Sequence, residues 1–505
     1  MSGLVIVYHR QPMEETVVDG KVQYREHRSP NGIIPALRGF FEHVGSAQWV
    51  AWTRTSPQVA AKGALERLRM DGDSGSYDVV RVPLSSDEVS QFYHVTSKEA
   101  LWPVINSSPG HYTTHNTRWS VFREVNKRFA KAACEVAAPG AVVWLHDYNL
   151  WLAPGYIREL RPDLKIAFFH HTAFPAADLF NMLPWRDEIL DSLLCCDQVG
   201  FHVPRYASNF ARLAEDLRGA VEVEWQPVDP RMGRPGMALS ERRQPVALHT
   251  EGRRIAVDCW PIGTSASAIR ETARRPEVIE RAQAIRGALG DGTLILSVGR
   301  VDYVKGVRQQ LEAYSRLLKR RPELQGKVRL LLVAVAPADG MAIYRAAQRE
   351  IEQLTGQING HFGTMDWMPV VLSTTPMPFD EVVAANVAAD IAWITPLRDG
   401  LNLVAKEYAA AKDGDAGVLV LSEFAGSAVE LPDAVSTNPY SMTQMDEAID
   451  AALDMPVAER RERMARMASY VGTYDMAHWT ATVRERFAQM AGWDEKRPAK
   501  RPQAA

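Results

Sequence analysis

The chain has 505 residues, a formal net charge of −3 and a hydrophobic fraction of 46%. This length exceeds one hydrophobic core, so we expect two domains of roughly 200 to 250 residues each. The near-neutral charge gives no basic surface for nucleic acid, and no apolar run approaches the roughly 20 residues that span a bilayer. Because the N-terminus leads directly into a predicted strand, without a signal peptide, we expect a cytoplasmic protein. The four cysteines lack C-x-x-C spacing, which argues against a zinc site or a disulfide framework.

The first half of the chain alternates short apolar runs with helical patterns, which is typical of parallel α/β units. Helices are predicted at 119–134 and 205–217. Residues 227–254 are polar and rich in Pro, Gly and Arg, and we interpret them as an irregular surface segment that could contain short strands. Residues 1–254 are therefore predicted to form the first domain, with strands at 4–8, 49–52, 79–84, 141–146, 166–170 and 198–202.

The second half repeats this alternation, and we predict a second domain over residues 255–474. A last helix follows at about 475–492. The tail, 495–505, is basic and contains proline, so it is predicted to be disordered. The predicted strands of this half are 294–298, 328–335, 369–372, 391–394 and 418–421.

Residues 395–408, T-P-L-R-D-G-L-N-L-V-A-K-E-Y, place a strand end, a glycine turn and a helix start next to one another. The free N–H groups and the positive dipole end of the first helical turn can hold a diphosphate. Glu407 could accept hydrogen bonds from ribose hydroxyls, and Asp399 would face sugar hydroxyls. The alternative is a surface turn at Arg398 and Asp399 and a solvated helix face at Lys406 and Glu407. The candidate donor-binding residues of this motif are Asp399, Gly400, Asn402, Leu403, Val404 and Glu407.

A second apolar run, 294–298, leads directly into G-R-V-D-Y-V-K-G, residues 299–306. At the carboxyl ends of parallel strands, Arg300 and Lys305 could neutralise phosphate oxygens and the charge that grows on a leaving diphosphate. Either residue alone could instead be a solvated surface cation. Lys305 could also be a Schiff-base lysine, although nothing near it resembles a cofactor-binding sequence. We predict that both residues bind the diphosphate of a donor.

These motifs, together with L-S-E-F-A-G-S-A-V-E-L (421–431), W-L-H-D-Y-N-L (144–150) and F-F-H-H-T-A-F-P (168–175), resemble those of the retaining, nucleotide-sugar-dependent glycosyltransferases that include trehalose-6-phosphate synthase. The resemblance spans most of the chain and keeps the family order of the motifs. It implies the GT-B arrangement, in which two Rossmann-like domains face a central cleft and the last helix returns to the first domain. It also implies a front-face reaction, in which the leaving diphosphate oxygen accepts the proton of the acceptor hydroxyl and no nucleophile is needed.

The resemblance gives individual residues an expected role. His171 matches the family histidine that meets the transferred sugar, whereas its neighbour His170 could be structural. Arg10 matches the arginine that grips the acceptor phosphate. The expected catalytic residues are His171, Arg300, Lys305, Asp399 and Glu407. Asn31 and Gly32 would close over donor and acceptor, and Tyr93, Trp102 and Asp147 would wall or hydrogen-bond the acceptor, although either aromatic residue could be core packing.

The departures from the trehalose-phosphate pattern fall where that family contacts its acceptor. The chain has Y-H-R at 8–10 instead of Ser-Asn-Arg, Asn149 instead of His, and P-A-D-G at 337–340 instead of a segment with a Ser-Arg pair. Because the donor-side motifs match, a changed acceptor is the economical inference. The resemblance implies transfer of glucose from ADP-glucose to sn-glycerol 3-phosphate, with transfer to glucose 6-phosphate as the alternative. A separate phosphatase would then release a compatible solute, which implies a role in salt tolerance.

Two other functional classes fit the sequence less well. A nicotinamide dehydrogenase needs G-x-G-x-x-G between a strand and a helix, and no predicted strand is followed by it. A catalytically silent sugar-phosphate sensor would have lost part of the charged set, but Arg300, Lys305, Asp399 and Glu407 are all present. The D-x-D patterns at 71–73 and 413–415 are interpreted as turns, so no catalytic metal or other cofactor is expected. A divalent ion with the nucleotide sugar and a homo-oligomeric state both stay open.

Overall fold

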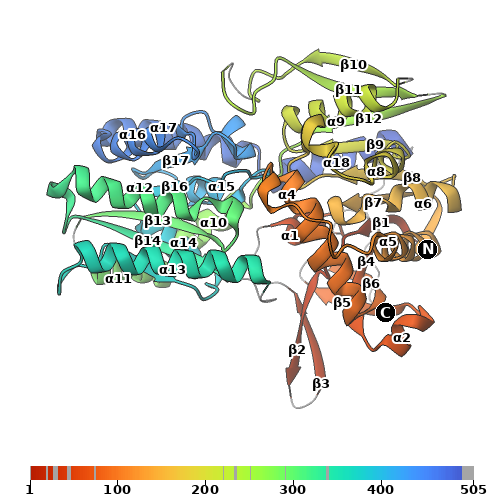
Figure 1. The fold of residues 1–505 in the computed structure, drawn as a ribbon, viewed down its shortest axis with the longest axis horizontal. Helices are drawn as coiled ribbons and strands as arrows, with labels where there is room; N and C mark the ends of the chain where they lie inside the picture. Colours follow the sequence, from red (N-terminus) through yellow and green to blue (C-terminus); the bar gives the residue numbers. More distant parts are fainter. Residues whose placement is uncertain are drawn as a thin grey trace, which may run out of the picture.

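The computed structural model describes residues 2–18, 21–26, 32–41, 47–72, 75–219, 221–232, 236–250, 252–289, 292–336 and 341–491. Asn31, the segment 337–340 and the tail 495–505 lie outside these residues. The described chain forms two α/β units that stand beside one another, each built on its own sheet (Figure 1). This arrangement confirms the predicted α/β class with two Rossmann-like domains in the GT-B manner.

The first sheet has ten strands, and its centre is parallel. The neighbours from β12 to β6 pair in parallel, whereas β5 pairs antiparallel with β6 at one edge and β10, β11 and β12 pair antiparallel at the other. In spatial order the strands are β10 (Glu222–Pro227), β11 (Arg243–Thr250), β12 (Arg253–Cys259), β9 (Gln198–Phe201), β8 (Lys165–Phe169), β7 (Ala137–His146), β1 (Ser2–Val7), β4 (Ala47–Thr55), β6 (Gly75–Ser85) and β5 (Glu66–Gly72).

Both faces of the first sheet are covered by helices. Because strand side chains alternate, Val5 and Val7 of β1 belong to one core cluster, and Leu4 and Ile6 belong to the other. The first cluster packs under α5 (Trp119–Val136), α6 (Ala153–Leu160), α8 (Arg186–Leu193) and α9 (Pro204–Leu217). The second packs under α1 (Ile33–Arg38) and the last helix, α18 (Met476–Ala491), which returns from the other unit (Figure 1).

The second sheet has six parallel strands, and it too is buried on both faces. Its spatial order is β15 (Val370–Ser373), β14 (Val328–Val335), β13 (Thr293–Arg300), β16 (Ile391–Ile394), β17 (Val418–Ser422) and β18 (Val435–Thr437). One face packs against α10 (Ala266–Ala273), α11 (Pro276–Leu289), α14 (Phe379–Ala388), α15 (Leu403–Ala411) and α17 (Val457–Thr473). The other face packs against α12 (Val307–Arg320), α13 (Ala342–Phe362) and α16 (Met442–Asp454).

The boundary predicted after residue 254 falls inside the first sheet. Residues Ala256 to Cys259 of β12 pair in parallel with β9, so the first unit includes this strand and the second begins with α10. The segment 227–254, predicted to be irregular, contains β11 and the end of β10. β10, at the edge of the sheet, alternates exposed and half-buried residues, β11 beside it is only partly buried, and the polar residues of both hide the strand pattern. The short strands that the sequence left open are therefore present.

Several further elements were not predicted, among them a hairpin and a π-helical segment. The hairpin of β2 (Met13–Val18) and β3 (Lys21–Glu26) projects from the first unit (Figure 1). Residues Ser90–Leu101 form a π-helical segment, η2, between β6 and α4 (Trp102–Ile105). Across the described part of the chain, no helix has both the length and the apolar character that a bilayer crossing requires.

The chain crosses between the units at two adjacent places. Gly263 lies so close to the returning segment that an added Cβ would stand 2.0 Å from the carbonyl carbon of Asp475. Nearby, the Lys406 ammonium of α15 donates to the Ile262 carbonyl at 2.8 Å and pairs with the Glu430 carboxylate at 2.7 Å. Both charged side chains are 1% exposed, so this ion pair is part of the core that joins the units.

We expect Trp479→Ala to destabilise the first unit. Trp479 is 2% exposed, its ring packs near Phe40 and Trp144, and its indole N–H donates to the Trp260 carbonyl. Truncation of such a side chain costs about 3–5 kcal/mol. The loss of stability is measured as a shift in the urea midpoint of the far-ultraviolet circular dichroism signal. Arg484→Ala, on the exposed side of α18, is the control. An unchanged midpoint for Trp479→Ala would contradict this packing.

Candidate functional site

A cavity of about 220 Å³ lies between the carboxyl ends of the two sheets, and we call it the cleft cavity. The loops that follow parallel strands converge at this edge of each sheet. Those after β1, β7 and β8 come from the first unit, and those after β13 and β16 come from the second. The cavity brings together these predicted site residues: Arg10, Tyr93, Trp102, Asp147, His171, Arg300, Lys305, Asp399 and Gly400.

An ion pair organises the part of the cleft cavity that the second unit forms, where the sequence predicts donor binding. The Lys305 ammonium lies 2.6 Å from the Asp399 carboxylate, and the Asn402 amide donates to the same carboxylate at 3.0 Å. Burial acts to raise the pKa of Asp399, but Lys305 and Asn402 hold that pKa below its usual value. The pair is partly buried, so Asp399 is not the solvated surface turn of the alternative interpretation. Arg300 is exposed and has no hydrogen bond or ion pair with the described residues.

The start of α15 has the geometry of an anion-binding helix terminus. Asn402, at φ 78, caps the helix, because its side-chain oxygen accepts from the Ala405 N–H at 3.1 Å. The N–H groups of Leu403 and Val404 precede that capped donor. The described residues that line the cleft cavity include Asp399 and Gly400 of this motif. They do not include the predicted donor-binding residues that follow in sequence: Asn402, Leu403, Val404 and Glu407.

Lys406 and Glu407 do not form a solvated helix face. Lys406 forms the buried ion pair with Glu430. Glu407 is half-buried, and burial raises the pKa of its carboxyl group to about 7. A carboxyl group in such surroundings would gain from the hydroxyl donors of a ribose.

His171 and His170 point to different environments, as the sequence left open. His171 lines the cleft cavity, and its Nε2 lies 3.1 Å from Nδ1 of His146. Burial lowers the pKa of both rings well below the usual value, so the pair is neutral and only one of the two facing nitrogens carries a proton. His170 instead stacks on Phe201, with ring centroids 4.9 Å apart, and is a core residue.

Asp147 stands at a tight turn after β7. Its backbone has φ 71, and its carboxylate accepts from the Thr172 hydroxyl at 3.0 Å. Burial raises the pKa of Asp147 to about 6, although the Thr172 hydrogen bond lowers it. The carboxylate faces the cavity and can accept a hydrogen bond from a sugar or polyol hydroxyl there.

The two units touch directly at Gly400. A Cβ added to this residue would lie 2.3 Å from the carbonyl oxygen of His171 and 2.8 Å from the Cα of Thr172. Real Cβ atoms do not approach backbone this closely, so only glycine fits while the units keep this spacing. Gly400 therefore sets how closely the turn of the second unit approaches the first unit at His171 and Thr172.

The residues predicted to bind the acceptor lie on η2 and at the end of β1. The Arg10 guanidinium donates to the Tyr93 hydroxyl at 3.0 Å, and the Tyr93 ring stacks on His9 with centroids 5.6 Å apart. The Trp102 ring lies 3.9 Å from the Lys98 ammonium. Gly32 directly precedes Ile33, and Ile33 lines the cavity. Asn31 lies outside the described residues.

Sequence reasoning missed Lys98, Asn106 and Arg398 as cavity residues. A π-helix joins residues five apart, and this places Lys98 beside Tyr93 rather than on the face that an ordinary helix would give it. Only the alternative interpretation of residues 395–408 mentioned Arg398, as part of a surface turn, whereas its guanidinium donates to the Ser107 hydroxyl at 2.9 Å. Its position beside Asp399 was the signal that could have identified it.

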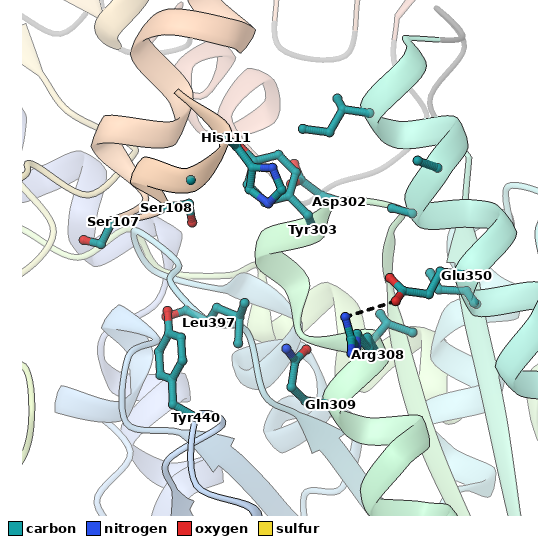
Figure 2. Close-up of a pocket in the computed structure, with 16 residues that line it drawn as sticks. Ser107, Ser108, His111, Asp302, Tyr303, Arg308, Gln309, Glu350, Leu397 and Tyr440 are labelled. Atoms are coloured by element: carbon teal, nitrogen blue, oxygen red, sulfur yellow. Dashed lines mark hydrogen bonds and ion pairs between the residues drawn. The ribbon is translucent and has the colours of Figure 1, made fainter. Parts of the chain in front are cut away.

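Figure 2 shows a second, larger cavity, of about 600 Å³. Ser107 in its lining accepts the hydrogen bond from Arg398, which lines the cleft cavity. In this second cavity the rings of His111 and Tyr303 lie with centroids 4.2 Å apart, and Arg308 pairs with Glu350 at 3.2 Å. None of the described residues that line it is a predicted site residue. We therefore take the cleft cavity as the candidate site.

Metal ligands do not gather among the residues that the structure describes: no group of three His, Cys, Asp or Glu side chains is close enough to hold an ion. In the D-x-D segment at 413–415, Asp413 pairs with Arg270 at 2.9 Å and Asp415 with Lys412 at 3.3 Å.

Comparison with known proteins agrees with this geometry. The model of glycosyltransferase family 20 matches residues 2–489. The chain is 49% identical to a glucosylglycerol-phosphate synthase of Synechocystis, over 97% of this chain and 98% of that protein. It is 36% identical to a trehalose-6-phosphate synthase of a Mycobacterium, over 95% and 94%. A solved structure described as trehalose-6-phosphate from E. coli bound with UDP-2-fluoro glucose has a TM-score of 0.82 and 26% identity, over 96% of this chain and 99% of that one. The chain is a glycosyltransferase and belongs to glycosyltransferase family 20.

Proposed function

We propose that this glycosyltransferase moves glucose from ADP-glucose to sn-glycerol 3-phosphate with retention, giving 2-O-(α-D-glucosyl)-sn-glycerol 3-phosphate and ADP. The carrying observation is that one cavity joins the Lys305–Asp399 pair of one unit to Arg10 and Asp147 of the other. The 49% identity to a glucosylglycerol-phosphate synthase over nearly the whole chain supports this acceptor. A separate phosphatase would then consume the product.

In the proposed reaction the bond between glucose C1 and the diphosphate oxygen breaks, and the acceptor hydroxyl oxygen bonds to C1 on the same face. The acceptor proton passes to the departing diphosphate oxygen. Lys305 and Arg300, which both line the cavity, stabilise the negative charge that grows on this oxygen. Because both cations are already in place, little reorganisation is needed during the reaction. His171, which is neutral, would hydrogen-bond the transferred sugar, and Asp147 would orient the acceptor hydroxyl.

A second candidate acceptor is glucose 6-phosphate, because a trehalose-6-phosphate synthase is 36% identical over 95% of the chain. A UDP-glucose donor is favoured by the neighbour bound with UDP-2-fluoro glucose. The test is nucleoside diphosphate release from ADP-glucose and UDP-glucose, each with glycerol 3-phosphate or glucose 6-phosphate, with the product identified. Turnover with ADP-glucose and glycerol 3-phosphate is expected. Turnover with glucose 6-phosphate alone would establish trehalose-phosphate synthesis instead, and no turnover in any pair would indicate a sensor.

Lys305→Ala is expected to lower kcat by about 10²- to 10³-fold or more, because it removes a preorganised cation from the leaving diphosphate. It also leaves Asp399 without its ion-pair partner. Steady-state kinetics with ADP-glucose measure the effect, and circular dichroism checks the fold. Lys319→Ala, on the exposed end of α12, is the matched control and should keep wild-type turnover. Near-normal turnover of Lys305→Ala would refute its assignment.

Arg10→Ala is expected to raise the KM for glycerol 3-phosphate about 10- to 100-fold, the effect of losing a hydrogen bond between charged groups. The KM for ADP-glucose should change little, because Arg10 belongs to the first unit and contacts Tyr93. Arg54→Ala, exposed at the end of β4, serves as the control. An effect confined to the donor KM would show that Arg10 lies on the other substrate.

A further inference from the structure

Lys98 is a buried cation that the reaction described above does not use. It lies on η2, lines the cleft cavity and is 8% exposed. Asp147 and Asp302 are near enough to interact with it electrostatically, but among the described residues it forms no ion pair and no side-chain hydrogen bond. Its ammonium instead lies 3.9 Å from the centre of the Trp102 ring and 5.7 Å from that of Tyr93.

This environment is unfavourable for a positive charge in the empty protein. Burial lowers the pKa of Lys98, and the nearby Arg300 and Arg10 lower it further, while Tyr93 and Asp302 act in the opposite direction. Cation–π contacts with two aromatic rings offset only part of the free energy that an ammonium group loses when it is removed from water. A cation kept in such a place is typical of a site that waits for an anion.

Tyr93 connects Lys98 to the predicted acceptor arginine. Its hydroxyl accepts from Arg10, and its ring borders the Lys98 ammonium. The three residues belong to the first unit, whereas the donor-side cation Lys305 belongs to the second and is already paired with Asp399. Arg10 and Lys98 therefore border the same part of the cavity, where a phosphate group could receive hydrogen bonds from both.

We propose that Lys98 is a specificity-determining residue that binds the acceptor phosphate together with Arg10 across Tyr93. This inference rests on the proposed function, because it takes the acceptor to be a small phosphate ester. The phosphate would be the hydrogen-bonded negative partner that the Lys98 ammonium does not have among the described residues. Lys98 thus favours a phosphorylated acceptor over the corresponding neutral polyol.

Lys98→Met tests this, because methionine keeps a flexible apolar stem and removes the charge. The KM for glycerol 3-phosphate should rise about 10- to 100-fold, with the KM for ADP-glucose nearly unchanged. Lys98→Arg should recover part of the loss. The melting temperature of Lys98→Met should stay equal or rise, because an uncompensated buried charge is gone. Lys131→Met, on the exposed face of α5, is the matched control and should match wild type.

A binding measurement separates this inference from the proposed function. Calorimetric titration of the wild type and Lys98→Met with glycerol 3-phosphate, glucose 6-phosphate and glycerol needs no turnover. Weaker binding of either phosphate ester to Lys98→Met, with no binding of glycerol to either protein, supports the role of Lys98 whichever ester is the true acceptor. Equal phosphate affinity with a lower melting temperature would show that Lys98 is only structural. A rise confined to the ADP-glucose KM would place it on the donor, and either result overturns the proposal. If Lys98→Met does not fold, Lys98→Gln decides in the same assays.

Discussion

The cleft cavity is lined by more positive than negative charge, although the whole chain carries a net charge of −3. Five cationic side chains face two carboxylates, and one carboxylate is already paired: the set is Arg10, Lys98, Arg300, Lys305, Arg398, Asp147 and Asp399. Like charges held together in a partly buried space repel, so bound anions would stabilise the arrangement. The two phosphate-bearing substrates of the proposed reaction would meet this constraint, which would account for the division of the cations between both units.

The parallel core of both sheets could be predicted because fully buried strands are continuous apolar runs. Residues 294–298 and 391–394 are examples, and each lies within or matches a strand of the second sheet. The edge of the first sheet could not be predicted in this way, because β10 and β11 expose one face to water and carry polar residues there. The predicted domain boundary failed at this place: β12 completes the first sheet through pairing with β9, a contact between distant parts of the sequence.

The residues of the candidate site also fall into those that could be predicted from the sequence and those that could not. Lys305 and Asp399 lie in short motifs at strand ends, and strand-end position alone predicts that they converge. Lys98 depends on the π-helical turn of η2, and the burial of Lys406 depends on Glu430, which belongs to another segment. Neither feature has a local sequence signal, because each arises from tertiary packing. The place of Lys98 in the cavity and the burial of Lys406 are therefore the features that the sequence alone describes least.

The contact at Gly400 has a consequence for how this protein can change over evolution. The glycine turn of the second unit rests on the backbone of His171 and Thr172 in the first, with no space for even one more carbon atom. A hybrid enzyme that joins the first unit of one family member to the second unit of another would bring together two surfaces that never adapted to each other. Such a hybrid can exchange donor and acceptor preferences only if both loops are inherited as one matched set.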